Sequence, residues 1–435
     1  MIAARGGVSV IDEKGFRMNQ LLKEIRRETI LDPLDALLAD VAIRIQLSAT
    51  DYGKAEFRNR VINDHLERDG SLLRGHVNLL YPQGSMAVGA TIASRLRTDE
   101  YDIDVIAELA LPTETPAEVV LNLLFHSIRG EQGSRYYDLV ERRTRCVTIH
   151  YADRMHIDLT PAVLCLGSPA RTSVLFHHRP RDPREPTYRL LANPWGFAEW
   201  FKEKTPPDDA FGRIFAERAA AFDSQVLLEK KAAAVPVPAQ QEAHEKAKAV
   251  IVLQLLKRWR NVQYDGRRGL RRPPSVIMAK LVADAANHTA TLFEELDVQA
   301  RYIRRVIGAA HDTRQKVHVI NPRCAQDNLT DRWPASLDEQ EQFIRDLDRL
   351  LARLVELPKS DLGRMRGIMT ELFGENPTGA VFESYNRRLG ESIASGRSMH
   401  LPGSGRVLAA AGAVPTRAVA TPVHTFFGRS RECLD

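Results

Sequence analysis

Two aspartates that alternate with apolar residues are the first feature of this 435-residue chain with an evident chemical use. In the run YDIDVIAEL, a β-strand would turn Asp102 and Asp104 to one face and Ile103 and Val105 to the other. Carboxylates two residues apart on a strand can bridge a pair of Mg²⁺ ions, which lie roughly 3.5–4 Å apart in two-metal sites. The pair therefore predicts a site for divalent metal.

A third acidic residue, Asp158, lies in a second strand-like run, MHIDLTPAV. We expect it to complete the set formed by Asp102 and Asp104 from a neighbouring strand. Mg²⁺ favours oxygen ligands and usually keeps substrate phosphates in its shell, and Mn²⁺ is the alternative ion. A metal site that uses His150 and His156 is a weaker alternative, because the carboxylates already satisfy a hard cation.

Upstream, Gly84 and Ser85 precede the helix-like run SMAVGATIASRL, for which Ser85 is a suitable N-cap. The N–H groups at a helix start bind phosphate oxygens, so the pair is a candidate triphosphate site. A Gly-Ser pair alone is often only a cap, and a DxD pair alone is often a solvated strand edge. In this order, with Asp158 downstream, the three motifs together favour metal-dependent nucleotidyl transfer.

Composition is that of an ordinary soluble globular protein, with 44% hydrophobic and 27% charged residues. The net charge of 61 − 56 = +5 suits an anionic ligand such as a nucleotide but does not demand duplex nucleic acid. Four scattered cysteines without a CxxC pair are typical of reduced thiols. No apolar run reaches the roughly 18 residues of a membrane span. We therefore expect a cytoplasmic protein with no membrane partner.

Hydrophobic periodicity predicts the elements that position these residues. We expect helices within residues 21–66 that pack on the back of a catalytic sheet, a helix over 115–128 and a strand hairpin over 145–161. Residues 166–196, rich in Pro, Arg and His, read as a loop or surface ribbon. A helix over 193–204 follows, and we expect its aromatic side chains to be core.

The chain divides into four predicted segments. Residues 1–20 form a flexible leader, in which Met18 is a candidate start. Residues 21–231 form the nucleotidyltransferase core with its N-terminal helices. An Ala- and Pro-rich run then opens a helical domain, residues 232–394, that closes the nucleotide cleft, and residues 395–435 form a flexible tail.

Lys257 lies in a predicted helix over residues 244–259, off its apolar stripe. From there it could reach a triphosphate bound at the domain cleft. The alternative is an ordinary surface lysine.

The motifs in this order resemble the bacterial cGAS/DncV-like nucleotidyltransferases, or CD-NTases, of cyclic-oligonucleotide anti-phage signalling. The resemblance extends over residues 40–385 and rests on YPQGSMAVGATI, YDIDVIAEL, HIDLTPAV, NPWGFAEWF, LLKRWRN, PPSVIMAKL and INPRCAQDNLTDRW. It implies an α+β fold with a polymerase-β-like nucleotidyltransferase core, built on a mixed sheet. It also implies a mainly helical C-terminal domain of the oligoadenylate-synthase type.

The resemblance also implies an activity. A ribose 2′- or 3′-hydroxyl would attack the α-phosphate of a nucleoside triphosphate, with ATP or GTP or both as substrates, to give a cyclic di- or trinucleotide. Gly84 and Ser85 would bind the triphosphate, and Asp102 and Asp104 would bind both metal ions. Asp158 would complete the metal site and help to deprotonate the attacking hydroxyl.

Two further residues take their roles from the resemblance alone. Lys257 and Ser275 occupy positions where the helical domain of the family touches phosphate or nucleobase. The separation between Ser85 and Asp102 is long for the wider superfamily, so the loop over residues 95–100 is a candidate lid. The acidic residues of that loop, Asp99 and Glu100, are alternative ligands without the strand alternation.

The end of the chain resembles a substrate for an E1/E2-like conjugating enzyme. The HTFFG run ends at Gly428, and seven residues follow it, so either a protease trims the tail or Asp435 is the end that is used. A downstream effector would receive the cyclic product. A linear oligonucleotide synthase, an RNA or protein nucleotidyltransferase and a non-catalytic sensor stay open, as do the bases, linkage and ring size.

Overall fold

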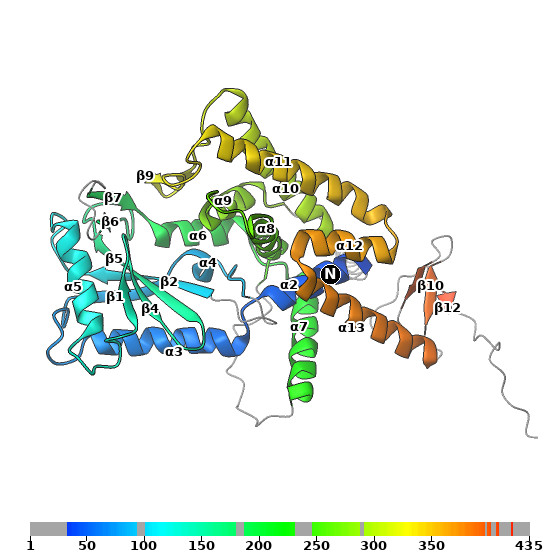
Figure 1. Cartoon of the computed structure of the whole chain (residues 1–435), viewed down its shortest axis with the longest axis horizontal. Coiled ribbons are helices and arrows are strands. Elements are labelled where there is room, and N and C mark those ends of the chain that lie inside the picture. The colour runs from blue at the N-terminus through cyan, green and yellow to red at the C-terminus, as the bar shows by residue number, and fades with distance from the viewer. Residues whose placement is uncertain are drawn as a thin grey trace, which may run out of the picture.

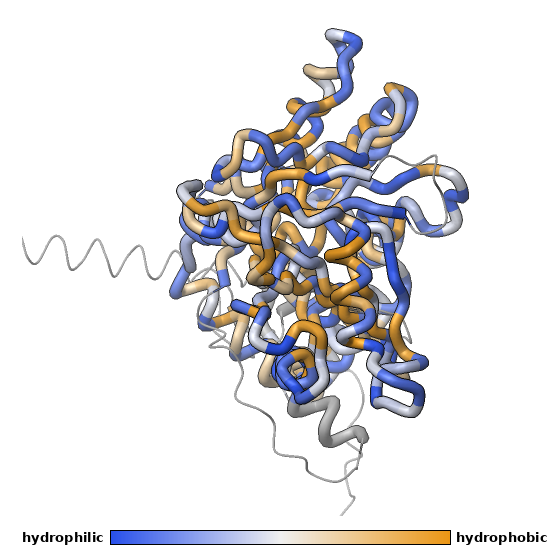
Figure 2. Tube along the Cα trace, turned by 90° about the vertical axis from the view of Figure 1, so that its left-hand side faces the viewer, coloured by the Kyte–Doolittle hydropathy of each residue, from blue (hydrophilic) through white to orange (hydrophobic). Residues whose placement is uncertain are grey.

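A computed structural model describes residues 33–93, 101–179, 187–230, 246–287, 291–395, 398–401, 406–408 and 419–420. Within these residues the chain forms a sheet body and a helical body that lie side by side (Figure 1). Apolar positions concentrate in the interior and hydrophilic positions on the protruding loops (Figure 2). The described residues contain no helix long and apolar enough to cross a membrane.

A mixed seven-stranded sheet forms the sheet body. Its strands follow the order β1-β2-β5-β4-β3, with β6 also paired to β5 and β7 paired to β6. Only β2 and β5 pair in parallel among these strands; the other pairs are antiparallel. The bounds are β1 Val77–Pro82, β2 Tyr101–Leu109, β3 Val140–Arg142, β4 Val147–His150, β5 Met155–Leu164, β6 Ser173–His177 and β7 Tyr188–Ala192.

One face of this sheet is covered by α3 (Ala49–Leu66) and α5 (Ala117–Arg129), which lie below and to the left of the strands in Figure 1. Their apolar stripes pack with alternate strand residues, such as Ile103, Val105 and Ile157, in one buried core. The predicted hairpin over residues 145–161 is confirmed as the β4–β5 pair. The other face carries the candidate site.

The prediction of a surface ribbon over residues 166–196 is wrong. β6 and β7 run through this segment, and Val174 and Phe176 are buried against the core. The short apolar run of Val174, Leu175 and Phe176 is the strand signal, and the flanking Pro and Arg residues obscured it.

The helical body contains α2 and α6–α13. Their bounds are α2 Pro33–Ile45, α6 Pro194–Lys204, α7 Asp209–Lys230, α8 Lys248–Tyr264, α9 Ser275–Ala285, α10 Leu292–Asp312, α11 Leu337–Glu356, α12 Leu362–Phe373 and α13 Glu375–Ala394. A short hairpin of β8 (Ile320–Asn321) and β9 (Cys324–Asn328) follows α10, and the single turn Leu357–Lys359 follows α11. Helix α8 runs through the centre, and Trp259, at 1% exposure, packs against Phe343.

The two buried cores divide the chain differently from the predicted segments. Helices α2 and α6 and the first turns of α7 pack in the core of the helical body, although they precede residue 232. The expectation that every helix within residues 21–66 covers the sheet therefore holds for α3 and is wrong for α2, whose Leu37, Leu38 and Val41 face the helical body. The run at residues 232–240 lies outside the described residues, so the predicted boundary stays a prediction.

A small three-stranded sheet follows α13. It consists of β10 (Met399–Leu401), β11 (Arg406–Leu408) and β12 (Val419–Ala420). These short strands lie within the segment predicted as a flexible tail, and its flexibility stays a prediction. Gly428, Asp435, Met18 and the loop over residues 95–100 lie outside the described residues.

Candidate active site

Three aspartates meet on the exposed face of the sheet. β2 and β5 are parallel neighbours, and their register places Asp104 directly beside Asp158 and Asp102 beside His156. Ile103 and Val105, which alternate with the β2 carboxylates, are buried on the opposite face. The alternation that the sequence predicts is therefore present, and it brings Asp102, Asp104 and Asp158 together.

The negative charges of these carboxylates repel one another. Burial and the charges of Asp158 and Asp102 raise the pKa of Asp104 to about 7, although Lys257 acts in the opposite direction. Burial also raises the pKa of Asp158, which is opposed by a 2.5 Å hydrogen bond that Thr148 Oγ1 donates to its Oδ1. This concentration of negative charge favours a bound cation.

The turn after β1 brings the backbone against these carboxylates. Gly84 has φ +57°, and a Cβ at this position would lie 2.9 Å from Asp104 Oδ2. Only glycine combines the left-handed conformation with so close an approach. A phosphate bound at the Gly84–Ser85 backbone would therefore lie next to the carboxylate of Asp104.

The helix expected after Ser85 is wrong in length and in its cap. Helix α4 spans only Gly84–Ala87, and its N-cap is Gln83, whose side chain makes no capping hydrogen bond. The chain turns at Gly89, φ +67°, and the carbonyls of Gly89 and Thr91 accept hydrogen bonds from Gln254 of α8. Hydrogen bonds to α8 are thus formed where the helix was expected to continue.

Lys257 links the two bodies at the site. It is 4% exposed, and its Nζ donates hydrogen bonds of 2.6 Å to Ser85 Oγ and 2.7 Å to the carbonyl of Ala90. Burial and the charge of Arg260 lower its pKa to about 7. The interpretation as a surface lysine is therefore wrong, and its ammonium group lies at the predicted triphosphate site.

Further positive charge lies behind Lys257. Arg260 is buried one turn along α8, and its Nη1 donates to the Pro273 carbonyl at 2.6 Å and to Ser275 Oγ at 3.2 Å. Burial and the nearby charge of Arg272 lower the pKa of Arg260 to about 9. Ser275, the first residue of α9, is thus joined to the site through Arg260 rather than in direct contact with Ser85.

The donor set fits a hard divalent cation completed by phosphate. It consists of carboxylate oxygens, whose mutual repulsion a cation would relieve. Among the described residues, no three His, Cys, Asp or Glu side chains form a ready-made metal cage. Mg²⁺ usually takes one or two carboxylates and fills the rest of its shell with water and substrate phosphates, so such a cage is not required.

Three residues near the site were not predicted from the sequence. Thr148 follows from the predicted hairpin, because the register of β4 and β5 places it opposite Asp158. Arg260 follows from helical spacing, since residues three apart share a face with Lys257. Arg272 carries no such signal. His156, predicted only as an alternative ligand, lies with Nδ1 3.6 Å from Asp102 Oδ1.

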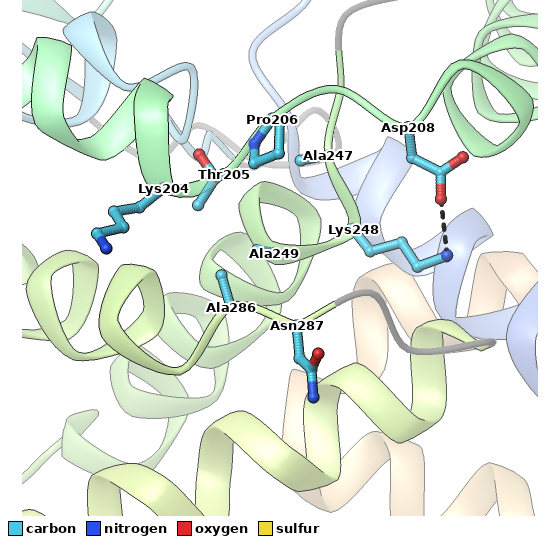
Figure 3. A pocket seen from close by; sticks show the side chains of 9 residues that line it. All are labelled: Lys204, Thr205, Pro206, Asp208, Ala247, Lys248, Ala249, Ala286 and Asn287. Carbon is cyan, nitrogen blue, oxygen red and sulfur yellow. Dashed lines mark hydrogen bonds and ion pairs between the residues drawn. The ribbon is translucent and has the colours of Figure 1, made fainter.

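A separate hollow lies where α6, α8 and α9 meet, lined by Lys204, Thr205, Lys248 and Asn287 among others (Figure 3). Lys248 is paired there with Asp208 at 2.8 Å, so its charge is neutralised within the protein. Asp102, Asp104 and Asp158 do not line this hollow, so it lacks the metal-binding groups of the candidate site.

Known proteins share this architecture. A family model described as SMODS, Second Messenger Oligonucleotide or Dinucleotide Synthetase domain, matches residues 33–172. The cyclic dinucleotide synthase CdnG of Bradyrhizobium diazoefficiens is 34% identical over 412 residues, which are 92% of this chain and 96% of that protein. The c-di-GMP synthase of Roseivirga ehrenbergii is 23% identical over 368 residues, 83% of this chain and 90% of that protein.

The solved structure of the Bradyrhizobium diazoefficiens CD-NTase CdnG in complex with GTP matches with a TM-score of 0.70 and 32% identity. The match covers 82% of this chain and 99% of that one. It confirms the α+β fold, with a polymerase-β-like core on a mixed sheet and a helical C-terminal region. The chain belongs to the CD-NTase family, the nucleotidyltransferases that synthesise cyclic oligonucleotides.

Proposed function

We propose that this enzyme binds GTP and joins two guanosine nucleotides into a cyclic dinucleotide. The proposal rests on one observation: negatively and positively charged side chains meet at the Gly84–Ser85 turn. The carboxylate of Asp104, with Asp158 beside it, lies against Gly84, and the buried ammonium of Lys257 contacts Ser85. A metal-bound triphosphate has this charge pattern. GTP is suggested by the relative solved in complex with GTP and by the relative named for c-di-GMP.

Asp102 and Asp104, with Asp158 beside them, would hold two divalent cations, Mg²⁺ or Mn²⁺. When bound, these ions would neutralise the α-phosphate and the leaving pyrophosphate. Ser85, Lys257 and the charge of Arg260 would hold the triphosphate. Ser275 would act on it only through Arg260.

The chemical step is a displacement at phosphorus. The ribose hydroxyl oxygen of the acceptor nucleotide forms a bond to the α-phosphorus of the donor, and the bond from that phosphorus to the bridging oxygen of pyrophosphate breaks. Asp158, whose pKa is raised by burial, takes the hydroxyl proton. A second displacement within the linear intermediate closes the ring. Alignment of the two nucleotides and charge compensation account for most of the acceleration.

In the cell, we propose that the enzyme acts in the cytoplasm as the signal generator of an anti-phage system, with its product read by an effector. The support is the family to which the chain belongs. Conjugation or trimming of the tail near Gly428 stays a prediction, because these residues lie outside those described.

Mass spectrometry of the reaction products tests the proposed function. Purified protein is incubated with the four nucleoside triphosphates singly and together, with Mg²⁺ or Mn²⁺, and the products are treated with phosphatase. A phosphatase-resistant product that contains guanosine is expected. Phosphatase-sensitive oligomers would indicate a linear synthase, label on RNA or protein would indicate a macromolecular acceptor, and binding without turnover would indicate a sensor.

A further inference from the structure

Five side chains form a polar cluster across the boundary between the two bodies. We call it the Arg145 cluster: Arg145 precedes β4, His177 ends β6, Tyr188 begins β7, and Asp331 and Arg332 follow β9. The last two come from the helical body and the first three from the sheet body.

Arg145 organises the cluster. Its Nη2 donates to Tyr188 Oη at 2.7 Å and to Asp331 Oδ2 at 2.6 Å, and its Nε donates to His177 Nδ1 at 3.0 Å. The rings of His177 and Tyr188 stack with centroids 4.2 Å apart and an interplanar angle of 10°. The Nε and Nη2 donors of Arg145 are therefore engaged within the protein, and the two rings are stacked beside them.

Arg332 differs from Arg145. Within the part of the chain that the structure describes, its guanidinium makes one polar contact, 3.4 Å from the His177 Nδ1 atom that already accepts from Arg145. The residue is exposed, but its backbone is anchored by Trp333, which is 1% exposed and packs edge-on against Phe343. Arg332 thus presents a planar set of donors for which the described residues supply no strong acceptor.

The cluster lies on the same face of the sheet as the carboxylates. Val174 and Phe176 of β6 belong to the buried core on the opposite face, so the alternation of the strand places His177 and its register partner Tyr188 on the catalytic face. Thr148, which bonds Asp158, is three residues beyond Arg145, about 10 Å along an extended chain. This separation is comparable to the length of a nucleoside.

The order of the strands shows which nucleotide the cluster would meet. The triphosphate cradle at Ser85 follows β1, on the far side of β2, whereas the cluster lies beyond β5, at β4, β6 and β7. The three carboxylates stand between them. A nucleotide beside the Arg145 cluster is therefore placed to attack the donor across the carboxylates, as the acceptor.

We propose that Arg332 selects guanine as the base of the acceptor nucleotide, with the 39% exposed Tyr188 as its stacking surface. A guanidinium donates two parallel hydrogen bonds to O6 and N7 of guanine, whereas adenine offers N7 beside the N6 amino donor. Arg145, held by Asp331, positions Tyr188 and does not bind the base. The inference rests on the proposed function and adds the residue that determines acceptor specificity.

The test follows transfer from a fixed donor to different acceptors. The donor is 2′,3′-dideoxyguanosine triphosphate labelled at the α-phosphate, which has no ribose hydroxyl with which to attack. The acceptors are GTP, 7-deaza-GTP, which lacks the N7 acceptor, and ATP, and kcat/KM is measured for the labelled linear dinucleotide. Arg332→Ala and Arg332→Lys are compared with Arg323→Ala, a control on the β8–β9 hairpin whose side chain pairs with Glu203.

Wild-type enzyme should prefer GTP over ATP and 7-deaza-GTP by about 10- to 100-fold. Arg332→Ala should remove most of that preference by lowering kcat/KM with GTP while the value with ATP stays unchanged. The GTP preference of Arg332→Lys should fall between those of wild type and Arg332→Ala. The preference of Arg323→Ala should match that of wild type. An unchanged GTP-to-ATP ratio in an active Arg332→Ala enzyme would overturn this inference alone. Absence of labelled dinucleotide from wild type with every acceptor would overturn the proposed function as well.

Discussion

Lys257 of α8 donates a 2.6 Å hydrogen bond to Ser85 Oγ, across a separation of 172 residues. The same ammonium group donates to the Ala90 carbonyl, so one buried cation holds both ends of the turn that follows β1. The helical body thus contributes directly to the proposed phosphate site of the sheet body. If the proposed function holds, catalysis would depend on the packing of the two bodies as well as on the carboxylates.

Replacement of this cation should lower both activity and stability. We expect Lys257→Met to lower kcat/KM for GTP about 10- to 100-fold, the usual effect of losing a hydrogen bond from a charged group. The melting temperature should also fall, because the Ser85 hydroxyl and the buried Ala90 carbonyl lose their donor. Steady-state kinetics and thermal unfolding measure the two effects. Lys202→Met, an exposed lysine of α6, is the control, and full activity in Lys257→Met would contradict the role of Lys257.

Two glycines of the same turn offer a matched pair. Gly84 and Gly89 both have positive φ, so an alanine at either position should cost about 1–2 kcal/mol of unfolding free energy. Only at Gly84 would the added Cβ meet Asp104; at Gly89 it would meet open space. Gly84→Ala should therefore abolish most activity, and Gly89→Ala should retain it. Equal activities of the two folded variants would show that the approach of Gly84 to Asp104 is unimportant.

The hydrogen bond from Thr148 should tune Asp158. It favours the ionised carboxylate and so lowers its pKa against the effect of burial. Thr148→Val removes the bond at nearly constant volume, so the acid limb of the pH–rate profile should move to higher pH. Activity should recover at alkaline pH, where Asp158 is ionised in either enzyme. A limb at the wild-type position would mean that Asp158 does not take part as the proton acceptor.

Metal affinity should depend on pH through Asp104. With a pKa of about 7, its carboxyl must lose a proton before it binds a cation, so affinity should fall about tenfold per pH unit below 7 and level off above it. Without metal, the protonated group contributes stability below its ordinary pKa of 3.8, and this contribution is lost as the pH rises through about 7.

Calorimetric titration with Mn²⁺ and thermal unfolding in EDTA measure these two dependences. Asp104→Asn is the control, since it should remove the contribution of Asp104 to both. A wild-type affinity that does not change between pH 6 and 8 would contradict the assignment of Asp104 as a metal ligand.

The carboxylates could be predicted from the sequence because their geometry is local. The period of two along a strand places Asp102 and Asp104 on one face whatever surrounds them. The hairpin, α5 and α6 followed from equally local patterns of turn, cap and periodicity.

Features that depend on distant contacts could not be predicted. Helix α4 ends early because Gln254 and Lys257, far along the chain, take the carbonyls that would continue it. Lys257 is off the stripe of α8 but buried, because α8 is surrounded on all sides. The pairing of Arg145 with Asp331 joins residues 186 positions apart, which no local pattern records.

The role of the carboxylates in the proposed function is best tested by comparing the product of wild-type enzyme with that of the Asp102→Asn, Asp104→Asn double variant. Both proteins are incubated with GTP and Mg²⁺, and phosphatase-resistant product is quantified by mass spectrometry, with circular dichroism to show that both are folded. We expect a cyclic guanosine dinucleotide from wild type and none from the double variant. Cyclic product at a comparable rate from the folded double variant would contradict it.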